Sequence, residues 1–379
     1  MEYRLVHKVK IRDEKVIYKD KFGKETQRVK ISVENYSDGL PVEIISDGKV
    51  IVSDRLTFGI SNFYIPFDAV NTSLEKTILV KVADIIEKYI VTLNPVRKRI
   101  FYILPHSHVD IGYTELQTEV EIKQWKNIEE GINLSKKFSD YKDGSAFKWN
   151  VEVLWAVKSY LENFPEKRES FYEAVRNGWI GLDATYANLL TGLSRPEELY
   201  RWLEYSNRLE EEIGVKIESA MISDVPGFTW GTVQAFADNG IKYFSVGTNE
   251  SDRIGNSLRF LGDKPFYWES PSGKDKILVW LAGKGYSWFH HWDLTKGDIS
   301  RVANYLEELE EGKYPYEIVH VRYTIGDNGG PNEELPDFIS EWNETHVTPL
   351  FKIATTNEMF VDFEKKYASS IPTLKGDFT

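Results

Sequence analysis

From about residue 98 onward, short apolar runs alternate with longer polar stretches, and this alternation constrains the fold more than any other feature. The apolar runs predict strands at residues 100–104, 147–153, 179–182, 219–222, 243–246, 277–281, 318–323 and 351–354. Helix-like stretches lie between them, at 118–138, 197–213, 229–239 and 298–311. Alternating strands and helices favour a parallel sheet with right-handed crossovers. We therefore expect an α/β fold with an irregular (β/α) barrel of seven or eight units; a doubly wound sheet is the alternative.

The first 97 residues show a different pattern, which is typical of β structure. Residues 27–34 alternate between apolar and polar with a period of two. Ser-Asp-Gly turn signals at 37–39 and 46–48 separate strand-like runs, and Asn94-Pro95 interrupts the pattern. We expect a small antiparallel β module at residues 1–97, followed by the barrel domain at residues 98–379.

The composition excludes several classes of protein. The 379 residues carry a net charge of −12, and no basic run stands out, which argues against nucleic acid or an anionic membrane as a partner. There is no cysteine, so any bound metal must be held by His, Asp, Glu or water. No 18-residue apolar span and no apolar segment at the N-terminus are present, so we expect a cytoplasmic protein without membrane contact. Self-association into a homo-oligomer is compatible with this composition.

The stretch after the first barrel strand carries the strongest chemical signal. Residues 105–113 read Pro-His-Ser-His-Val-Asp-Ile-Gly-Tyr. In an extended chain His106, His108 and Asp110 have a period of two, so their side chains can point the same way. Imidazole and carboxylate suit zinc or another divalent first-row metal, although two hydrogen-bonded loop histidines are the simpler alternative.

Polar and aromatic residues also follow the later strands. Chemistry gathers at the C-terminal strand ends in such barrels, and each residue taken singly has an ordinary structural explanation. We single these residues out because they are all expected at the same rim of the barrel, formed by the C-terminal strand ends. The residues that we expect to bind the substrate there are Tyr113, Asp183, Trp230, Trp288, His291 and Asn328.

Two further strand-end carboxylates, Asp224 and Asp327, suit the hydrolysis of a sugar acetal. In a retaining glycosidase one carboxylate attacks the anomeric carbon and the other protonates the leaving oxygen. A metal that touches only one carboxylate would separate the two pKa values in the required direction.

At these residues the sequence resembles glycoside hydrolase family 38, the zinc-dependent retaining α-mannosidases. Residues 105–113 look like the family's first motif, which implies that His108 and Asp110 bind Zn²⁺ and that Tyr113, commonly Trp in the family, stacks on the mannose. Residues 222–227 resemble the second motif, with Val225 inserted, which implies that Asp224 is both zinc ligand and nucleophile. Residues 326–330 are similar to the loop that carries the acid, which implies Asp327; many members have Asp where this chain has Asn328.

The resemblance covers residues 98–379, the N-terminal catalytic domain of the family, and implies that the metal holds hydroxyls of the mannose. The family's remaining zinc-ligand histidine lies beyond the barrel, so we expect a fragment of a longer enzyme, which can be inactive alone. His290 or His291 is the alternative final ligand. We expect His106 to lie behind the ligands and position them.

Two other functions fit the same residues. A metal-dependent polysaccharide deacetylase or amidohydrolase also needs His and Asp at strand ends, with metal-bound water attacking an amide. A non-catalytic sugar-binding domain would bind zinc without turnover. The resemblance favours an α-mannosidase-like hydrolase that cleaves terminal α-mannosides through a covalent glycosyl-enzyme on Asp224.

Overall fold

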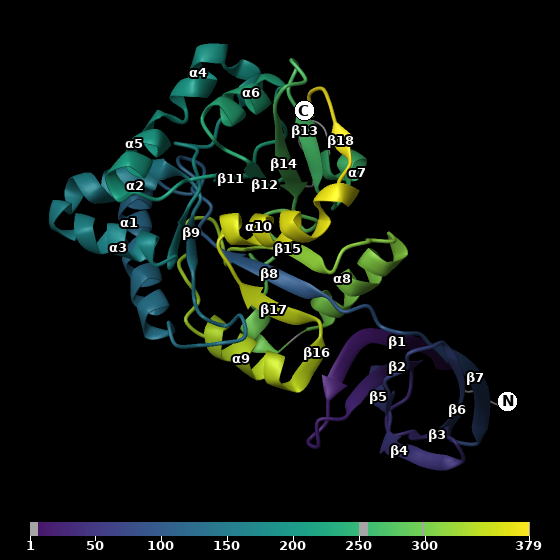
Figure 1. The fold of residues 1–379 in the computed structure, drawn as a ribbon. Coiled ribbons are helices and arrows are strands. Elements are labelled where there is room, and N and C mark those ends of the chain that lie inside the picture. Colours follow the sequence, from purple (N-terminus) through teal and green to yellow (C-terminus); the bar gives the residue numbers. More distant parts are fainter. Residues whose placement is uncertain (1–6, 250–256, 298, 379) are drawn as a thin grey trace. The chain divides into compact units, whose positions relative to one another are not determined.

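The computed structural model of the chain describes residues 7–249, 257–297 and 299–378 (Figure 1). They form two compact units. The first takes in the described part of Met1–Arg99 together with Ile299–Glu317 and Trp342–Leu350. The second takes in the described parts of Ile100–Asp298, Ile318–Glu341 and Phe351–Thr379. The domain boundary placed near residue 97 from the sequence stays a prediction.

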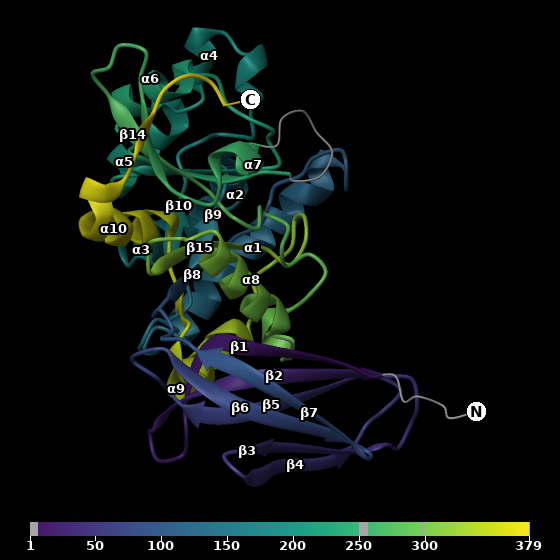
Figure 2. The same cartoon turned by 90° about the vertical axis from the view of Figure 1, so that its right-hand side faces the viewer.

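The first unit contains two four-stranded antiparallel sheets, with strand orders β16-β1-β2-β5 and β4-β3-β6-β7 (Figure 2). The strands are β1 (His7–Lys19), β2 (Glu25–Asn35), β3 (Pro41–Ser46), β4 (Lys49–Arg55), β5 (Gly59–Asp68), β6 (Leu74–Val82), β7 (Ile85–Leu93) and β16 (His346–Thr348). Helix α8 (Ser300–Glu311) belongs to the same unit, and its Glu307 pairs with Arg12 of β1 at 2.8 Å.

The alternation in the sequence explains how these two sheets pack. Val29, Ile31 and Val33 of β2 are fully buried, whereas the residues between them are partly exposed. They join one aliphatic core with buried residues from β3, β5, β6 and β7, so the two sheets pack face to face as a sandwich. The β3–β4 hairpin turns at Asp47 and Gly48, which both have positive φ, as a two-residue hairpin loop requires. The expected antiparallel module is confirmed.

The second unit is α/β, as expected. Its strands are β8 (Ile100–Pro105), β9 (Trp149–Val151), β10 (Ile180–Leu182), β11 (Ser219–Ser223), β12 (Tyr243–Gly247), β13 (Phe266–Glu269), β14 (Lys276–Leu281), β15 (Ile318–Tyr323), β17 (Leu350–Ile353) and β18 (Thr373–Leu374). The pairs β8–β15, β9–β10, β11–β12 and β12–β14 are parallel. Strand β13 runs antiparallel to β14, which the alternating pattern did not predict.

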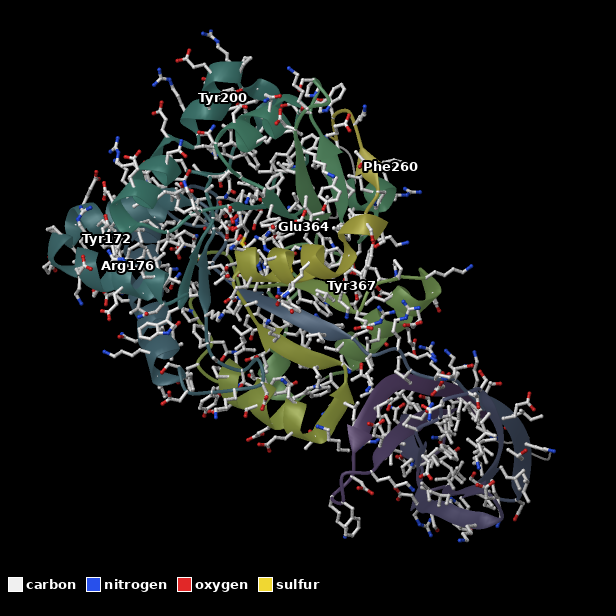
Figure 3. All side chains as sticks on the ribbon, in the orientation of Figure 1. Tyr172, Arg176, Tyr200, Phe260, Glu364 and Tyr367 are labelled. Carbon is white, nitrogen blue, oxygen red and sulfur yellow. The ribbon has the colours of Figure 1, made fainter. Side chains whose placement is uncertain are left out.

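Helices follow most of these strands. They are α1 (Gln117–Lys137), α2 (Leu154–Asn163), α3 (Arg168–Arg176), α4 (Pro196–Arg201), α5 (Glu204–Ile213), α6 (Gly231–Asp238), α7 (Ser257–Leu261), α9 (Leu335–Thr345) and α10 (Thr356–Tyr367), with single 3-10 turns at Pro165–Lys167, Thr191–Leu193, Leu294–Lys296 and Ala368–Ser370. Glu364 of α10, labelled in Figure 3, accepts hydrogen bonds from Tyr243 of β12 at 2.8 Å and Tyr267 of β13 at 2.5 Å. These bonds fix α10 against the sheet.

The hydrogen bonds of the described residues do not show the irregular (β/α) barrel of seven or eight units that the sequence predicts. The strands of the second unit fall into three sheets, ordered β15-β8-β17, β10-β9 and β11-β12-β14-β13-β18. Strands β9 and β10 have only three residues each, which is too short for continuous pairing with their neighbours. A single bridge from His106 to Asn150 and a hydrogen bond from Ala184 N to Ser219 O connect the sheets.

The predicted helices also differ in detail. The stretch at 197–213 contains two helices, α4 and α5. In the stretch at 298–311, α8 begins at Ser300, Ile299 is its N-cap, and Asp298 lies outside the described residues. No helix in the described part of the chain is long and apolar enough to cross a membrane.

Candidate active site

The chain after β8 turns into the site, and its first histidine is fixed in the interior. His106 N donates to Tyr323 O at 3.0 Å, which continues the β8–β15 pairing by one residue. Its Nδ1 bonds to Leu104 O at 3.0 Å, and its Nε2 accepts from Arg322 Nη2 at 3.0 Å. Burial and the Arg322 charge hold the pKa of His106 well below its usual value. Because both ring nitrogens are occupied, His106 is a neutral imidazole without a free nitrogen.

His108 is held differently. Its Nδ1 donates to the Glu152 carboxylate, at 3.3 Å and 3.4 Å to the two oxygens, and its ring contacts Tyr286 edge-on with centroids 4.8 Å apart. Burial alone would lower the pKa of His108, but the Glu152 carboxylate raises it above the usual value. The bond to Nδ1 leaves Nε2 available on the side of a cavity that His108 lines.

Glu152, which directly follows β9, joins two strand ends through one buried carboxylate. It accepts from Val109 N at 3.3 Å, beside the His108 bonds, and from Ser223 N at 2.8 Å at the end of β11. Burial would raise the pKa of Glu152, but His108, Arg322 and the Ser223 bond lower it below the usual value. Glu152 is therefore an anion that spans the segments carrying His108 and Asp224.

Asp224 follows β11 in a conformation that a non-glycine residue rarely adopts. Its φ is +60°, and its backbone N donates to Gly247 O at 3.0 Å. Asn249 donates from Nδ2 to Asp224 Oδ1 at 2.6 Å, which orients the carboxylate. Non-glycine residues in the left-handed region cost free energy and cluster at functional sites.

The loop after β15 brings a second carboxylate close to His108. Asp327 forms a parallel bridge with His108, and Asn328 N donates to His108 O at 2.8 Å. The Asn328 side chain donates to Asp110 O at 2.7 Å and accepts from Asp110 N at 3.2 Å. Asn328 therefore fixes the backbone of Asp110, and its amide is used inside the protein and not toward a substrate.

Asp327 lies in surroundings that raise its pKa. Its Oδ1 is buried without a hydrogen-bond partner among the described residues, and His290 Nε2 lies 3.8 Å from it. Burial raises the pKa of Asp327, His108 and His290 oppose this, and the negative charges of Asp110 and Asp224 add to the rise. The net pKa lies above the usual value for aspartate.

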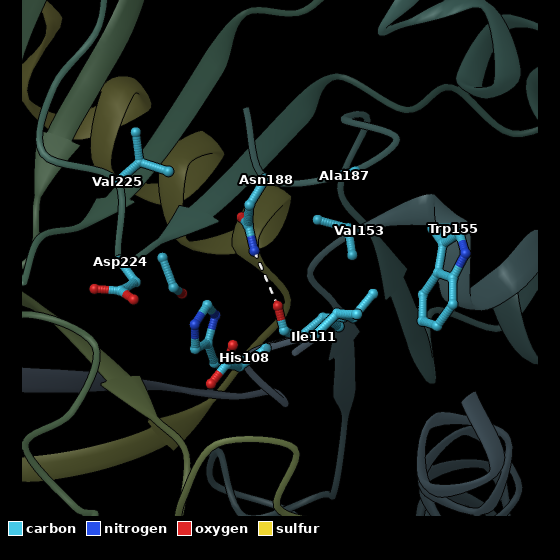
Figure 4. Close-up of a pocket in the computed structure, with 11 residues that line it drawn as sticks. His108, Ile111, Val153, Trp155, Ala187, Asn188, Asp224 and Val225 are labelled. Atoms are coloured by element: carbon cyan, nitrogen blue, oxygen red, sulfur yellow. Dashed lines mark hydrogen bonds between the residues drawn. The ribbon is translucent and has the colours of Figure 1, made fainter. Parts of the chain in front are cut away.

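A cavity of about 270 Å³ lies at these strand ends (Figure 4). His108, Asp110, Ser223 and Asp224 line it, together with Asn188, Trp155 and several apolar side chains. Figure 4 shows Asp224 and His108 on one side and Trp155 on the other. The structure thus brings together three of the polar residues singled out from the sequence.

The donor set around this cavity is chemically suited to zinc. His108 Nε2 is available, and no described residue donates to the Asp110 carboxylate, so nitrogen and oxygen ligands face one space. Among the described residues no three His, Asp or Glu side chains converge closely enough to hold a metal ion. The residues fit the metal in ligand type, and their side chains would have to close around it.

Several residues expected to bind the substrate lie elsewhere in the second unit. Asp183 is fully buried and accepts from Ser219 at 2.8 Å and Thr356 at 2.9 Å, and burial raises its pKa to about 7. Trp230 donates its indole N–H to Glu269 O at 2.6 Å. Neither residue lines the cavity.

The other expected contacts are on the surface or packed on aromatic neighbours. Tyr113 is 86% exposed, and His291 is also exposed. Trp288 packs against Phe289 and Trp292, with ring centroids 4.9 Å and 5.4 Å away. These three residues are not among those that line the cavity.

Glu152 and Tyr286 are the site residues that the sequence reasoning missed. Residues 147–153 alternate as Phe-Lys-Trp-Asn-Val-Glu-Val, and a carboxylate near the C-terminal end of a predicted barrel strand is itself a signal. Tyr286 gave no comparable signal. It is buried between His108 and His290, and burial together with the Asp224 charge raises its pKa.

Three solved structures have a fold similar to part of this chain. An alpha-mannosidase from Enterococcus faecalis V583 superposes with a TM-score of 0.59 at 16% identity, covering 74% of this chain and 31% of that one. A glycosyl hydrolase family 38 protein from Enterococcus faecalis gives 0.51 at 17% identity, covering 74% and 29%. A 4-alpha-glucanotransferase from Thermococcus litoralis gives 0.50 at 13% identity, covering 74% and 42%.

The sequence itself then identifies the family. The profile described as "Glycosyl hydrolases family 38 N-terminal domain" matches residues 98–377, and the chain belongs to this family of glycoside hydrolases. The chain spans about a third of the length of the first two structural neighbours. No curated protein sequence matches it.

Proposed function

We propose that this chain is the catalytic part of a retaining, α-mannosidase-like glycosidase that cleaves terminal α-mannosides, with Asp224 as nucleophile and Asp327 as acid. The observation that carries the proposal is the contrast between the two carboxyl groups. Asp327 is partly buried and has its pKa raised, whereas Asp224 lines the cavity and accepts a hydrogen bond from Asn249. A retaining mechanism needs one protonated and one ionised carboxyl at neutral pH.

The proposed reaction has two steps. Asp224 attacks the anomeric carbon as Asp327 gives its proton to the leaving oxygen, so the glycosidic bond breaks and a glycosyl ester forms on Asp224. Asp327, now ionised, takes a proton from water, and the hydroxide oxygen attacks the same carbon and releases Asp224. The bond from Asn249 holds the Asp224 carboxylate in one orientation for this attack.

His108, Asp110 and Asp224 are the residues that would hold Zn²⁺. When bound, the metal would orient sugar hydroxyls and help keep the Asp224 carboxylate ionised. Glu152 would act as a positioning residue, because it fixes the protonated Nδ1 of His108 and keeps Nε2 free. His106 would act more remotely, since it supports Arg322 inside the fold.

The acid role is tested with Asp327→Asn on α-mannosides of different leaving groups. Poor leaving groups need protonation, so their cleavage should fall by roughly 100- to 10,000-fold, and good aryl leaving groups should lose far less. Because the acid works protonated, wild-type activity should decline as pH rises through its raised pKa, and the variant should lack this decline.

Asp238→Asn is the matched control, since Asp238 is an exposed residue on α6 that hydrogen-bonds Tyr200. It should behave as wild type. Equal losses of Asp327→Asn for good and poor leaving groups would remove Asp327 from the acid role. Release of acetate from acetylated sugars by the wild type, without cleavage of any mannoside, would favour the deacetylase alternative.

A further inference from the structure

Strand β5 forms one edge of the sheet β16-β1-β2-β5 in the first unit, and only one of its two sides is paired (Figure 1). It pairs with β2 from Gly59 to Asp68, and the described residues show no strand on its other side. An edge strand presents a row of unpaired N–H and C=O groups, on which a strand of another chain can pair. With ten residues, β5 is long enough for such pairing.

The sequence of β5 lacks the charged side chains that protect edge strands from association. Residues 59–67 read Gly-Ile-Ser-Asn-Phe-Tyr-Ile-Pro-Phe and contain no charge, although 28% of the chain is charged. The other edge strands that the structure describes in this unit differ. Three of the seven residues of β4 and two of the nine residues of β7 are charged, and β16 has only three residues. Charges and short length block pairing at an edge, so β5 is the edge most open to a partner strand.

The side chains on the outer face of β5 are exposed and mostly apolar. Ile60 is 62% exposed and Tyr64 is 46% exposed, and the exposed Asn62 lies between them. On the neighbouring strand β2, Ser32 Oγ donates to Asn62 Oδ1 at 2.7 Å. Lys30 Nζ lies 5.8 Å from the centre of the Tyr64 ring. A strand added beside β5 would cover part of Ile60 and Tyr64 and so remove apolar surface from water.

Pro66 indicates which backbone groups of β5 face the open edge. Proline has no N–H, so within a sheet it lies where that group would point away from the neighbouring strand. Alternate residues turn their backbone groups to the same side, so Ile60, Asn62 and Tyr64 also present N–H and C=O at the open edge. Antiparallel pairing of two β5 strands centred on Asn62 matches Ile60 of one copy with Tyr64 of the other. Pro66 then lies opposite Phe58, which precedes the strand, so no pair within the strands lacks an N–H.

We propose that β5 is the interface of a homodimer, in which the β5 strands of two copies of this chain pair antiparallel across a two-fold axis at Asn62. The charges beside β5 suit a second copy, because on β2 Glu34 lies opposite Ile60 and Lys30 lies opposite Tyr64. Across the axis each row of side chains therefore reads Glu34, Ile60, Tyr64, Lys30. Apolar side chains meet in the middle of the row, and the charges at its two ends are opposite. The same edge of both copies is used, so association stops at two.

The dimer is tested by sedimentation velocity of the full 379-residue chain over a range of concentrations. Wild type should associate reversibly to twice its mass of 43.9 kDa. Asn62→Lys places two ammonium groups opposite each other at the axis, and like charges in that position are destabilising. The dissociation constant of the dimer should therefore rise at least ~10-fold in this variant.

Thr92→Lys is the matched control, since Thr92 is an exposed residue of β7, an edge strand of the other sheet. It should associate as wild type does. A wild type that is monomeric at every concentration would overturn the proposal, and so would a dimer that Asn62→Lys leaves intact.

A disulfide test checks the register of the two strands separately. The chain contains no cysteine, so Asn62→Cys carries a single thiol and can form a disulfide only with a second copy. Two residues in a hydrogen-bonded antiparallel pair have Cα atoms ~5.5 Å apart, which suits a disulfide. With a mild oxidant Asn62→Cys should become a covalent dimer, whereas Thr92→Cys should stay mostly monomeric. Equal cross-linking of the two variants, or none in Asn62→Cys, would overturn the proposal.

Discussion

The two units of this protein bury very different interiors. The sandwich core of the first unit is an aliphatic cluster of Val, Ile and Leu side chains. The second unit buries ionisable groups within and directly after its strands, and those at most 1% exposed include His106, Glu152, Asp183, His320 and Arg322. Aliphatic packing needs only complementary shapes, whereas each buried polar group needs a partner.

In the second unit the buried polar groups share hydrogen-bond partners. Arg322 donates to His106, to Ser223 and to Ile222 O, and Glu152 accepts from three donors on two segments. Burial lowers the pKa of Arg322 to about 10, and Glu152 and Asp183 oppose that shift. Burying polar groups in the second unit costs desolvation free energy, but the hydrogen bonds of these groups fix the residues that line the cavity.

The largest effect that would sharpen this comparison is expected for Glu152→Gln. Glutamine has one acceptor oxygen, so it cannot hold His108 Nδ1, Val109 N and Ser223 N together. We expect zinc affinity to fall by roughly 10- to 100-fold, measured by titrating the chelator-stripped chain. Glu162→Gln, at an exposed residue of α2 paired with Lys158, is the matched control. Unchanged affinity in Glu152→Gln would mean that Glu152 does not position a ligand.

A different, pH-dependent effect on stability is expected for Asp183→Asn. Because the folded-state pKa of Asp183 is raised to about 7, its contribution to stability is fully present below the unfolded pKa, near 4, and is lost as pH rises toward 7. Wild type should lose about 1.4 kcal/mol of unfolding free energy per pH unit in this window relative to Asp183→Asn. Denaturant unfolding at several pH values measures the difference.

Ile31→Ala in the sandwich is the control for that experiment. It should cost about 2–5 kcal/mol by leaving a cavity, and the cost should not depend on pH because no ionisable group is removed. If Asp183→Asn runs parallel to wild type across pH 4–7, then Asp183 does not carry a buried proton.

The sequence predicted elements well where a local pattern decides them. The alternation at 27–34 corresponds to β2, and the apolar run at 100–104 corresponds to β8, after which His108 and Asp110 reach the cavity. The aliphatic side chains of β2 share one face, and only that face can be buried in the core. The alternation in the sequence therefore predicts the strand and its buried face correctly.

The parts that local patterns did not predict depend on contacts between distant segments. Whether strands close into a barrel depends on the length of β9 and β10 and on the antiparallel β13, which the apolar runs did not reveal. Asp183 follows a strand as a catalytic residue would, but its side chain meets Ser219 and Thr356 in the interior. Position at a strand end is therefore not sufficient to predict a side chain that faces substrate.

The most direct test of the account is the zinc content and α-mannoside cleavage of wild type and Asp224→Ala, before and after chelation. Asp224 has two proposed roles, as zinc ligand and as nucleophile. Wild type should therefore hold near-stoichiometric zinc and lose cleavage when chelated. Asp224→Ala should lose most of its zinc and at least ~1,000-fold in cleavage. An Asp224→Ala chain that binds as much zinc as wild type, or cleaves mannosides as fast, would contradict the central claim.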